Sequence, residues 1–178
     1  DNVTKLDVKW AFGFPNSRTV FGQPSIVNGR VFVGSDTGEV YALNATTGCV
    51  HWMYKAENGV RTAITVAGIG NNRTAAFFGD GKGKVYAVNA ENGQELWKAI
   101  AESHPTAKLT GAPVVFEDKL YVPVASGEEG AGGGEQVLPV LDERVEEALV
   151  LRDQAGHRCS SGSTTAGRGG RGRTRRRR

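Results

Sequence analysis

The chain carries an internal repeat that constrains its fold more than any other feature of the sequence. Residues 38–52 align without a gap with residues 83–97, at an offset of 45 residues, and both read Gly-x-Val-Tyr-Ala-Leu/Val-Asn-Ala-x-x-Gly-x-x-x-Trp. Val-Tyr-Ala-Leu/Val is typical of a short strand, because β-branched and aromatic residues fit a pleated, half-buried surface. Asn-Ala-x-x-Gly is typical of a hairpin turn, because Asn tolerates a left-handed backbone and Gly adopts positive φ without a Cβ clash. The repeat therefore predicts paired antiparallel strands.

Three tryptophans are expected at the ends of successive strands. Trp52 and Trp97 close the two repeats, and Trp10 lies 42 residues before Trp52, which predicts an earlier strand that ends in the same way. A tryptophan has a large apolar area to bury. We expect these tryptophans, together with Tyr41 and Tyr86, to pack between neighbouring sheets rather than to form a floor for a cofactor.

Each repeat is accompanied by two further candidate strands. Residues 24–34 read as a strand, an Asn-Gly turn and a second strand, and residues 113–122 repeat that pattern with Glu-Asp-Lys at the turn. Residues 61–66 and 75–79 are the matching strands of the middle unit. One unit is thus four short antiparallel strands in about 40–45 residues, which is the period of a propeller blade.

The sequence therefore predicts an all-β fold, a β-propeller of four-stranded antiparallel blades. About three blades are present, so the propeller is incomplete. An immunoglobulin-like sandwich would also supply short strands at regular spacing, but it does not predict a Trp-closed repeat at this period. After residues 120–126 the chain becomes Gly-rich where the second strand pair of the third blade is expected.

The repeat resembles the PQQ-type propeller repeat. Longer phrases resemble polyvinyl-alcohol-dehydrogenase-like quinoproteins more specifically; they lie at residues 9–15, 59–64, 78–80, 104–105 and 110–113. The resemblance covers residues 5–129. It implies a quinoprotein alcohol dehydrogenase-like propeller of eight blades, in a periplasmic or secreted oxidoreductase.

The resemblance also implies a chemistry. An alcohol or a polymeric alcohol would be oxidised to a carbonyl while hydride passes to pyrroloquinoline quinone (PQQ), with Ca²⁺ as Lewis acid and a carboxylate as base. An external cytochrome c is the implied electron acceptor. Non-catalytic propellers share the blade repeat, so a scaffold that binds protein or polymer stays open as the alternative. With about three blades, this chain alone is expected to be inactive.

Four residues are candidates for cofactor binding. Arg61 opens what is expected to be the inner strand of the second blade, where a planar bidentate donor would suit a PQQ carboxylate. Thr62 and Thr110, at inner-strand starts taken as equivalent, are candidate hydroxyl donors, and Gln23 precedes the first inner strand. A turn or surface role is the alternative for Arg61. The sequence identifies no catalytic base.

Metal and membrane signals are weak. Asp36 and Asp80 are interpreted as turn residues, and the sequence predicts no metal ligands. Cys49 and Cys159 form no CxxC, CxxCH or zinc pattern; Cys49 is expected simply to pack in a strand, and a disulfide between the two stays open.

No run of 18 apolar residues predicts a membrane span, and residues 1–10 do not resemble a signal peptide.

The chain is predicted to divide into a partial propeller, residues 1–129, and a Gly/Arg-rich tail, residues 130–178. Residues 135–178 lack Phe, Tyr, Met, Ile, Asn, Lys and Trp, and carry 10 Arg against 6 acidic residues, a net charge of +4. One hypothesis is a gene read out of frame after about residue 134; the other is a native disordered tail. The Arg-rich end could contact the phosphates of a nucleic acid, but it has no aromatic residue on which a base could stack. No nucleic-acid partner is therefore predicted.

Overall fold

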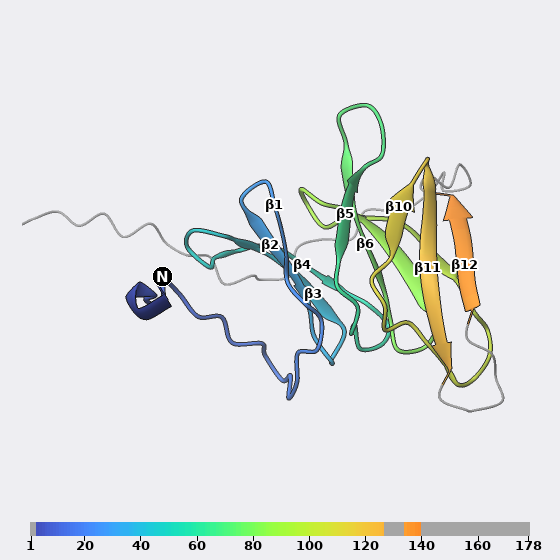
Figure 1. Ribbon diagram of the computed structural model, residues 1–178, viewed down its shortest axis with the longest axis horizontal. Helices are drawn as coiled ribbons and strands as arrows, with labels where there is room; N and C mark the ends of the chain where they lie inside the picture. Colours follow the sequence, from blue (N-terminus) through green and yellow to red (C-terminus); the bar gives the residue numbers. More distant parts are fainter. Residues whose placement is uncertain (1–2, 127–133, 140–178) are drawn as a thin grey trace, which may run out of the picture.

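The computed structural model describes residues 3–126 and 134–139, which form three consecutive four-stranded sheets (Figure 1). All pairings within the sheets are antiparallel. The only helix in the described residues is the short 3₁₀ turn η1, Val3–Lys5. The prediction of an all-β, partial propeller of four-stranded blades is confirmed.

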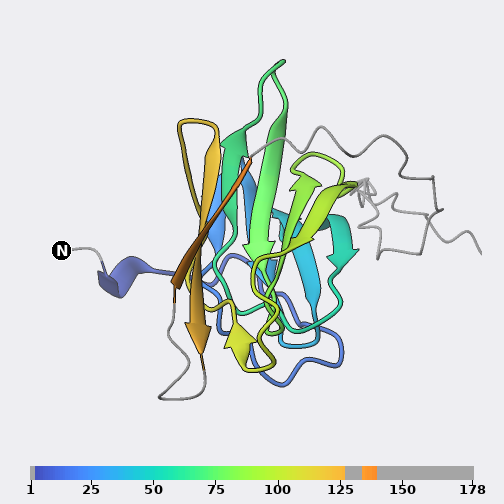
Figure 2. The ribbon, with the colours of Figure 1, turned by 90° about the vertical axis from the view of Figure 1, so that its right-hand side faces the viewer.

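In blades one and two, each strand pairs with the strand that follows it in the chain. Blade one comprises β1 (Ser25–Val27), β2 (Arg30–Gly34), β3 (Glu39–Asn44) and β4 (Val50–Lys55). Blade two comprises β5 (Thr65–Gly68), β6 (Thr74–Gly79), β7 (Lys84–Asn89) and β8 (Glu95–Ile100). The first strand of blade two, β5, lies beside both β1 and the first strand of blade three, so these strands form the common inner edge. Figure 2 views the same arrangement from the side of blade three.

Blade three is built on β10 (Val114–Phe116), β11 (Lys119–Ser126) and β12 (Gly134–Pro139), with the two-residue strand β9 (Ala107–Lys108) pairing with the far end of β11. Lys119 pairs with Pro139 just as Arg30 pairs with Asn44 in blade one. By this register β12 occupies the place of β3 and β7. β12 lies after residue 129, which is the boundary that the composition predicts between the partial propeller and the Gly/Arg-rich tail.

The predicted turn chemistry is present in both complete blades. The Asn44 side chain accepts hydrogen bonds from the backbone N–H groups of Thr46 and Thr47, each at 2.9 Å, and Asn89 makes the same pair of bonds in blade two. Gly48 follows with a φ of 73°. These local bonds reverse the chain between the third and fourth strands, as the Asn-Ala-x-x-Gly pattern predicts.

The tryptophans pack between blades, as expected. The Trp52 ring lies against Gly93 of the next blade, where an added Cβ would be 2.8 Å from the ring, and its indole N–H donates to the carbonyl of Ala90 at 3.1 Å. Trp10 repeats both contacts on blade one. The expectation that Trp52 ends its strand is wrong: β4 continues to Lys55 because its pairing with β3 continues to that residue.

Residues 6–14 do not form the predicted earlier strand, since no strand in the described part of the chain pairs with them. Instead Phe12 and Phe14 pack edge-on against Tyr41, with ring centroids 5.1 and 5.7 Å away. This segment covers the outer face of blade one. Two further buried clusters lie between blades one and two and between blades two and three, so blade two is covered on both faces.

Candidate functional site

An open depression of about 370 Å³ lies where the connecting loops of blades one and two meet. Its walls come from the segment before β1, the β2–β3 turn, the β4–β5 connection and the β6–β7 turn. The side chains that line it are Thr19, Phe21, Asp36, Asn58, Arg61 and Lys82. Both blades are therefore needed to form it.

Arg61 is the one sequence-predicted site residue that lines this depression. It is exposed, and its guanidinium carbon lies 4.0 Å from the centroid of the Phe21 ring, a cation–π contact between the two blades. Arg61 does not open the inner strand as expected, because β5 begins only at Thr65. It lies in the connection that leads to that strand.

Thr62 is buried, and its hydroxyl is used within blade two. The hydroxyl oxygen accepts the N–H of Gly79 at 3.1 Å, and the hydroxyl contacts the carbonyl of the same residue at 3.4 Å. These bonds fix the end of β6 against the connection. The sequence predicts that Thr62 is a cofactor donor, but its placement favours a structural role.

Thr110 and Gln23 are both exposed, and neither lines the depression. The sequence pattern predicts that Thr62 and Thr110 are equivalent, but the strand register aligns Thr110 with a different residue. Thr65 is the first residue of β5 and Val114 is the first residue of β10, and they pair with matching positions of β6 and β11. Thr110 lies four residues before Val114, just as Arg61 lies four residues before Thr65. Thr110 therefore corresponds to Arg61. Arg61 and Thr62 are neighbours in the β4–β5 connection, and Gly22, next to Gln23, lies against their carbonyl groups, whereas Thr110 lies in the connection before β10.

Asp36 lines the depression as an anion whose two oxygens are already engaged. The Ser17 hydroxyl donates to Oδ1 at 2.5 Å and the Thr19 hydroxyl to Oδ2 at 2.9 Å. The hydrogen bonds from Ser17, and next from Thr19, lower the pKa of the Asp36 carboxyl. Asp36 is therefore charged at neutral pH and braces the segment before β1.

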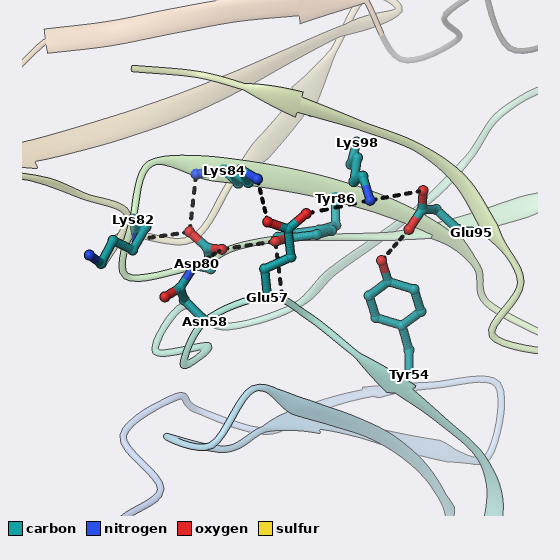
Figure 3. A network of polar contacts seen from close by, with 9 residues as sticks. All are labelled: Tyr54, Glu57, Asn58, Asp80, Lys82, Lys84, Tyr86, Glu95 and Lys98. Carbon is teal, nitrogen blue, oxygen red and sulfur yellow. Dashed lines mark hydrogen bonds and ion pairs between the residues drawn. The ribbon is translucent and has the colours of Figure 1, made fainter. Parts of the chain in front are cut away.

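A buried carboxylate, Asp80, bonds to two residues that line the depression, Asn58 and Lys82 (Figure 3). Asp80 Oδ1 accepts the backbone N–H groups of Lys82 and Lys84 at 2.8 and 3.1 Å. Its Oδ2 accepts the Tyr86 hydroxyl at 2.8 Å and the Asn58 amide at 3.4 Å. Asp80 is indeed a turn residue, and it also ties the β6–β7 turn to the β4–β5 connection.

This linking role of Asp80 is not predicted from the sequence. Asp80 lies six residues before Tyr86 in the second repeat, and the first repeat has Ser35 at the same distance before Tyr41. This exchange of serine for aspartate is the signal in the sequence. Burial, and the bond that its hydroxyl donates to Asp80, raise the pKa of Tyr86 above its ordinary value. The tyrosine therefore stays a neutral donor to the buried carboxylate.

The described residues fit the implied cofactors only in part. An exposed arginine beside a depression suits a carboxylate of PQQ, so Arg61 fits this part of the group. Residues 3–126 and 134–139 contain no group of three or more His, Cys, Asp or Glu side chains placed to hold a metal ion. These residues therefore do not fit the implied calcium site.

Cys49 lies in the turn immediately before β4, not in a strand, and it is disulfide-bonded. The expectation of simple packing is therefore wrong. Cys159 lies outside the described residues.

Among the helices that the structure describes, none is long and apolar enough to cross a membrane.

Comparison with known proteins places the chain in a family. The family model PQQ_2, described as outer membrane protein assembly factor BamB, matches residues 7–132. Polyvinylalcohol dehydrogenase of Sphingopyxis sp. (strain 113P3) is 40% identical over 131 residues, which make up 72% of this chain and 20% of that protein. The chain thus spans about one fifth of the curated relatives it matches.

Solved structures agree on the fold. A europium-containing methanol dehydrogenase matches with a TM-score of 0.65 and 26% identity, over 78% of this chain and 26% of that one. The quinohemoprotein alcohol dehydrogenase of Comamonas testosteroni matches with a TM-score of 0.58 and 22% identity, over 70% of this chain and 20% of that one. The predicted resemblance to polyvinyl-alcohol-dehydrogenase-like quinoproteins is confirmed. The chain belongs to the PQQ_2 family of β-propeller repeat proteins.

Proposed function

We propose that the chain is part of a PQQ-dependent alcohol dehydrogenase-like quinoprotein that oxidises an alcohol or a polymeric alcohol. The observation that carries the proposal is the 40% identity over 131 residues to a polyvinylalcohol dehydrogenase. Because the chain spans only about one fifth of that relative, the isolated chain is proposed to be inactive. A periplasmic or secreted location, calcium in the complete protein and an external cytochrome c acceptor belong to the same proposal.

When bound, PQQ would supply the quinone carbonyl that accepts hydride from the alcohol. The contribution of this chain would be binding and orientation. Arg61, held by the ring of Phe21, would pair with a carboxylate of the cofactor. Thr62 would keep the connection in place through its bonds to Gly79, and Thr110 and Gln23 stay predictions for hydroxyl and amide donors. The calcium ligands and the catalytic base would come from other residues of the complete protein.

One observation favours the alternative function, a non-catalytic scaffold that binds protein or polymer. The matching family model bears the description of an outer membrane protein assembly factor. A scaffold requires the blades and their surface but no catalytic base and no metal. The two functions therefore differ in whether PQQ binds.

Dye-linked oxidation of polyvinyl alcohol in the presence of PQQ and Ca²⁺ tests the proposal. We expect no dye reduction by the isolated 178 residues and turnover by the complete parent protein. PQQ with Ca²⁺ should also raise the melting temperature of the complete protein, because a ligand that binds only the folded state stabilises it. Absence of both the thermal shift and turnover in the complete protein would favour the scaffold, and dye reduction by the chain alone would contradict its proposed inactivity.

The division into a propeller, residues 1–129, and a tail, residues 130–178, is also a proposal. It is tested by resequencing the gene and translating the downstream DNA in all frames. Further Trp-closed repeats in another frame would support a frameshift near residue 134. A verified reading frame with the present residues would instead support a native tail.

A further inference from the structure

Residues 6–14 make the contacts of a fourth strand, although no strand in the described part of the chain pairs with them. The indole N–H of Trp10 donates to the carbonyl of Ala45 at 3.1 Å, and that of Trp52 donates to the carbonyl of Ala90 in blade two at the same distance. Trp10 is nevertheless only half-buried, whereas Trp52 is 7% exposed. Trp10 therefore has the blade that follows it but lacks a blade of its own.

The residue two positions after each tryptophan repeats the comparison. Phe12 packs edge-on against Tyr41, with ring centroids 5.1 Å apart. In the same way Tyr54 packs edge-on against Tyr86 of blade two, at 5.9 Å. Residues 6–14 thus lie on blade one as β4 lies on blade two.

Blade three shows the opposite deficiency. In blades one and two, the closing tryptophan pairs with an alanine of the third strand, which pairs with a phenylalanine of the second strand; these rows are Trp52–Ala42–Phe32 and Trp97–Ala87–Phe77. The two rings of each row are in contact, with centroids 5.9 and 6.1 Å apart. In blade three Val137 pairs with Tyr121, but among the described residues no strand pairs with the outer edge of β12. The register therefore assigns a closing tryptophan to the place beside Tyr121.

The chain does not carry this tryptophan at the expected distance after β12. Pro139 takes the register position of Asn44, and it has no N–H for the turn bond that the Asn44 N–H makes at 2.8 Å. Trp52 lies eight residues after Asn44, whereas the residue eight positions after Pro139 is Glu147. Two of the three tryptophans in the chain close blades one and two, so Trp10 is the one that is left to close blade three.

The free face of blade three is apolar. Phe116 is 60% exposed and Val114 is 56% exposed. By register Phe116 takes the place of Val27 and Ala67, which both pack into the junction with the blade that follows theirs. This face is therefore one half of a blade junction.

We propose that the other half is supplied by a second copy of this chain. Residues 6–14 of one copy pair with β12 of another as its fourth strand, with Trp10 opposite Val137 and its ring against Tyr121. An edge strand such as β12 can accept a further strand through its backbone groups. Residues 6–14 and β12 lie at opposite ends of the row of blades, so the contact joins copies head to tail (Figure 1). The proposal requires neither PQQ nor alcohol oxidation.

Analytical ultracentrifugation of the full chain over a range of concentrations tests the proposal. We expect the mass to rise with concentration above the 18.9 kDa of one copy. Phe116→Glu should weaken association more than about tenfold, because the junction would bury an unpaired carboxylate. Since Phe116 is exposed in a single copy, the melting temperature at low concentration should not change. Ile100→Glu is the matched control on β8, where the side chain is 63% exposed outside the junction, and it should change association by less than about twofold.

A peptide with the sequence of residues 6–14 separates this contact from other modes of association. The peptide supplies the fourth strand without a blade, so in excess it should bind the chain and reduce its mass to that of one copy plus the peptide. The same peptide with Trp10→Ala should bind more than about tenfold more weakly, because it lacks the aromatic anchor. A single copy at every concentration, association that persists in Phe116→Glu or in excess peptide, or an equal loss in Ile100→Glu would overturn the proposal. None of these results depends on dye reduction or on PQQ, so the proposed function fails or stands separately.

Discussion

Blades one and two close the same backbone turn with different side chains. In blade one the N–H of Ser35 donates to the carbonyl of Glu39 at 2.8 Å, and in blade two Asp80 and Lys84 make the same bond at 2.9 Å. The next connection then donates to the first residue of each turn, Val60 to Ser35 at 2.9 Å and Leu109 to Asp80 at 3.1 Å. The backbone bonds repeat although the turn residues differ.

The two blades place their negative charge differently. In blade one the carboxylate that binds the first turn residue, Ser35, belongs to Glu39, in the strand, where it also binds Thr37 and Lys55 near the surface. In blade two it belongs to Asp80, in the turn and fully buried, where it reaches Asn58 of the preceding connection. The comparison teaches that a repeat conserves the backbone geometry of a blade, while a single substitution inside it can create a link between blades.

The largest expected effect comes from the tryptophan that joins the two blades. Trp52→Ala should lower the free energy of unfolding by about 4 kcal/mol, because it removes a buried aromatic side chain and leaves a cavity against Gly93. Trp10→Ala, the matched change on a half-buried ring, should cost less. Urea denaturation followed by circular dichroism measures both. Equal losses would show that blade one depends on residues 10–14 as much as on blade two.

An intermediate effect is expected at the turn itself. Asp80→Ala should lower the free energy of unfolding by about 3 kcal/mol, because it leaves two backbone N–H groups and the Tyr86 hydroxyl without their acceptor. Ser35→Ala at the equivalent position of blade one should cost about 1 kcal/mol. The same denaturation experiment compares them. A loss for Asp80→Ala no larger than that for Ser35→Ala would contradict the proposed link between the blades.

The last effect concerns pH. Burial opposes ionisation of Glu39, but the hydrogen bonds from Lys55, Thr37 and Ser35 outweigh it and lower the pKa of this carboxyl from 4.5 to about 2. A folded-state pKa below the unfolded value means that this stabilisation is complete above pH 4.5 and is lost as the pH falls towards 2. Glu39→Gln should flatten the acid limb of the stability curve. Urea midpoints between those two pH values would measure the difference, and parallel curves would refute it.

Much of the fold could be predicted from the sequence, because its signals are local. The Asn44 turn bonds reach only two and three residues along the chain, and Asn28-Gly29 adopts positive φ at both residues. The site could be predicted less well. Arg61 is a candidate from the sequence alone, but its partner Phe21 lies forty residues earlier, in the segment before β1. The predicted equivalence of Thr62 and Thr110 is wrong because the repeat does not fix the length of the connection before each inner strand. Only the strand register shows that Thr110 is aligned with Arg61, one residue before Thr62.

The sequence by itself determined most of the strands of blades one and two, their hairpin turns and the tryptophans that dock one blade on the next. These depend on backbone preferences within a few residues and on the period of the repeat. Only the tertiary structure decided that Asp80 binds Asn58, that Thr62 is buried against Gly79, and that Arg61 and Lys82 share one depression. The physical reason is that these contacts join connections of different blades, so they exist only after whole sheets have packed together.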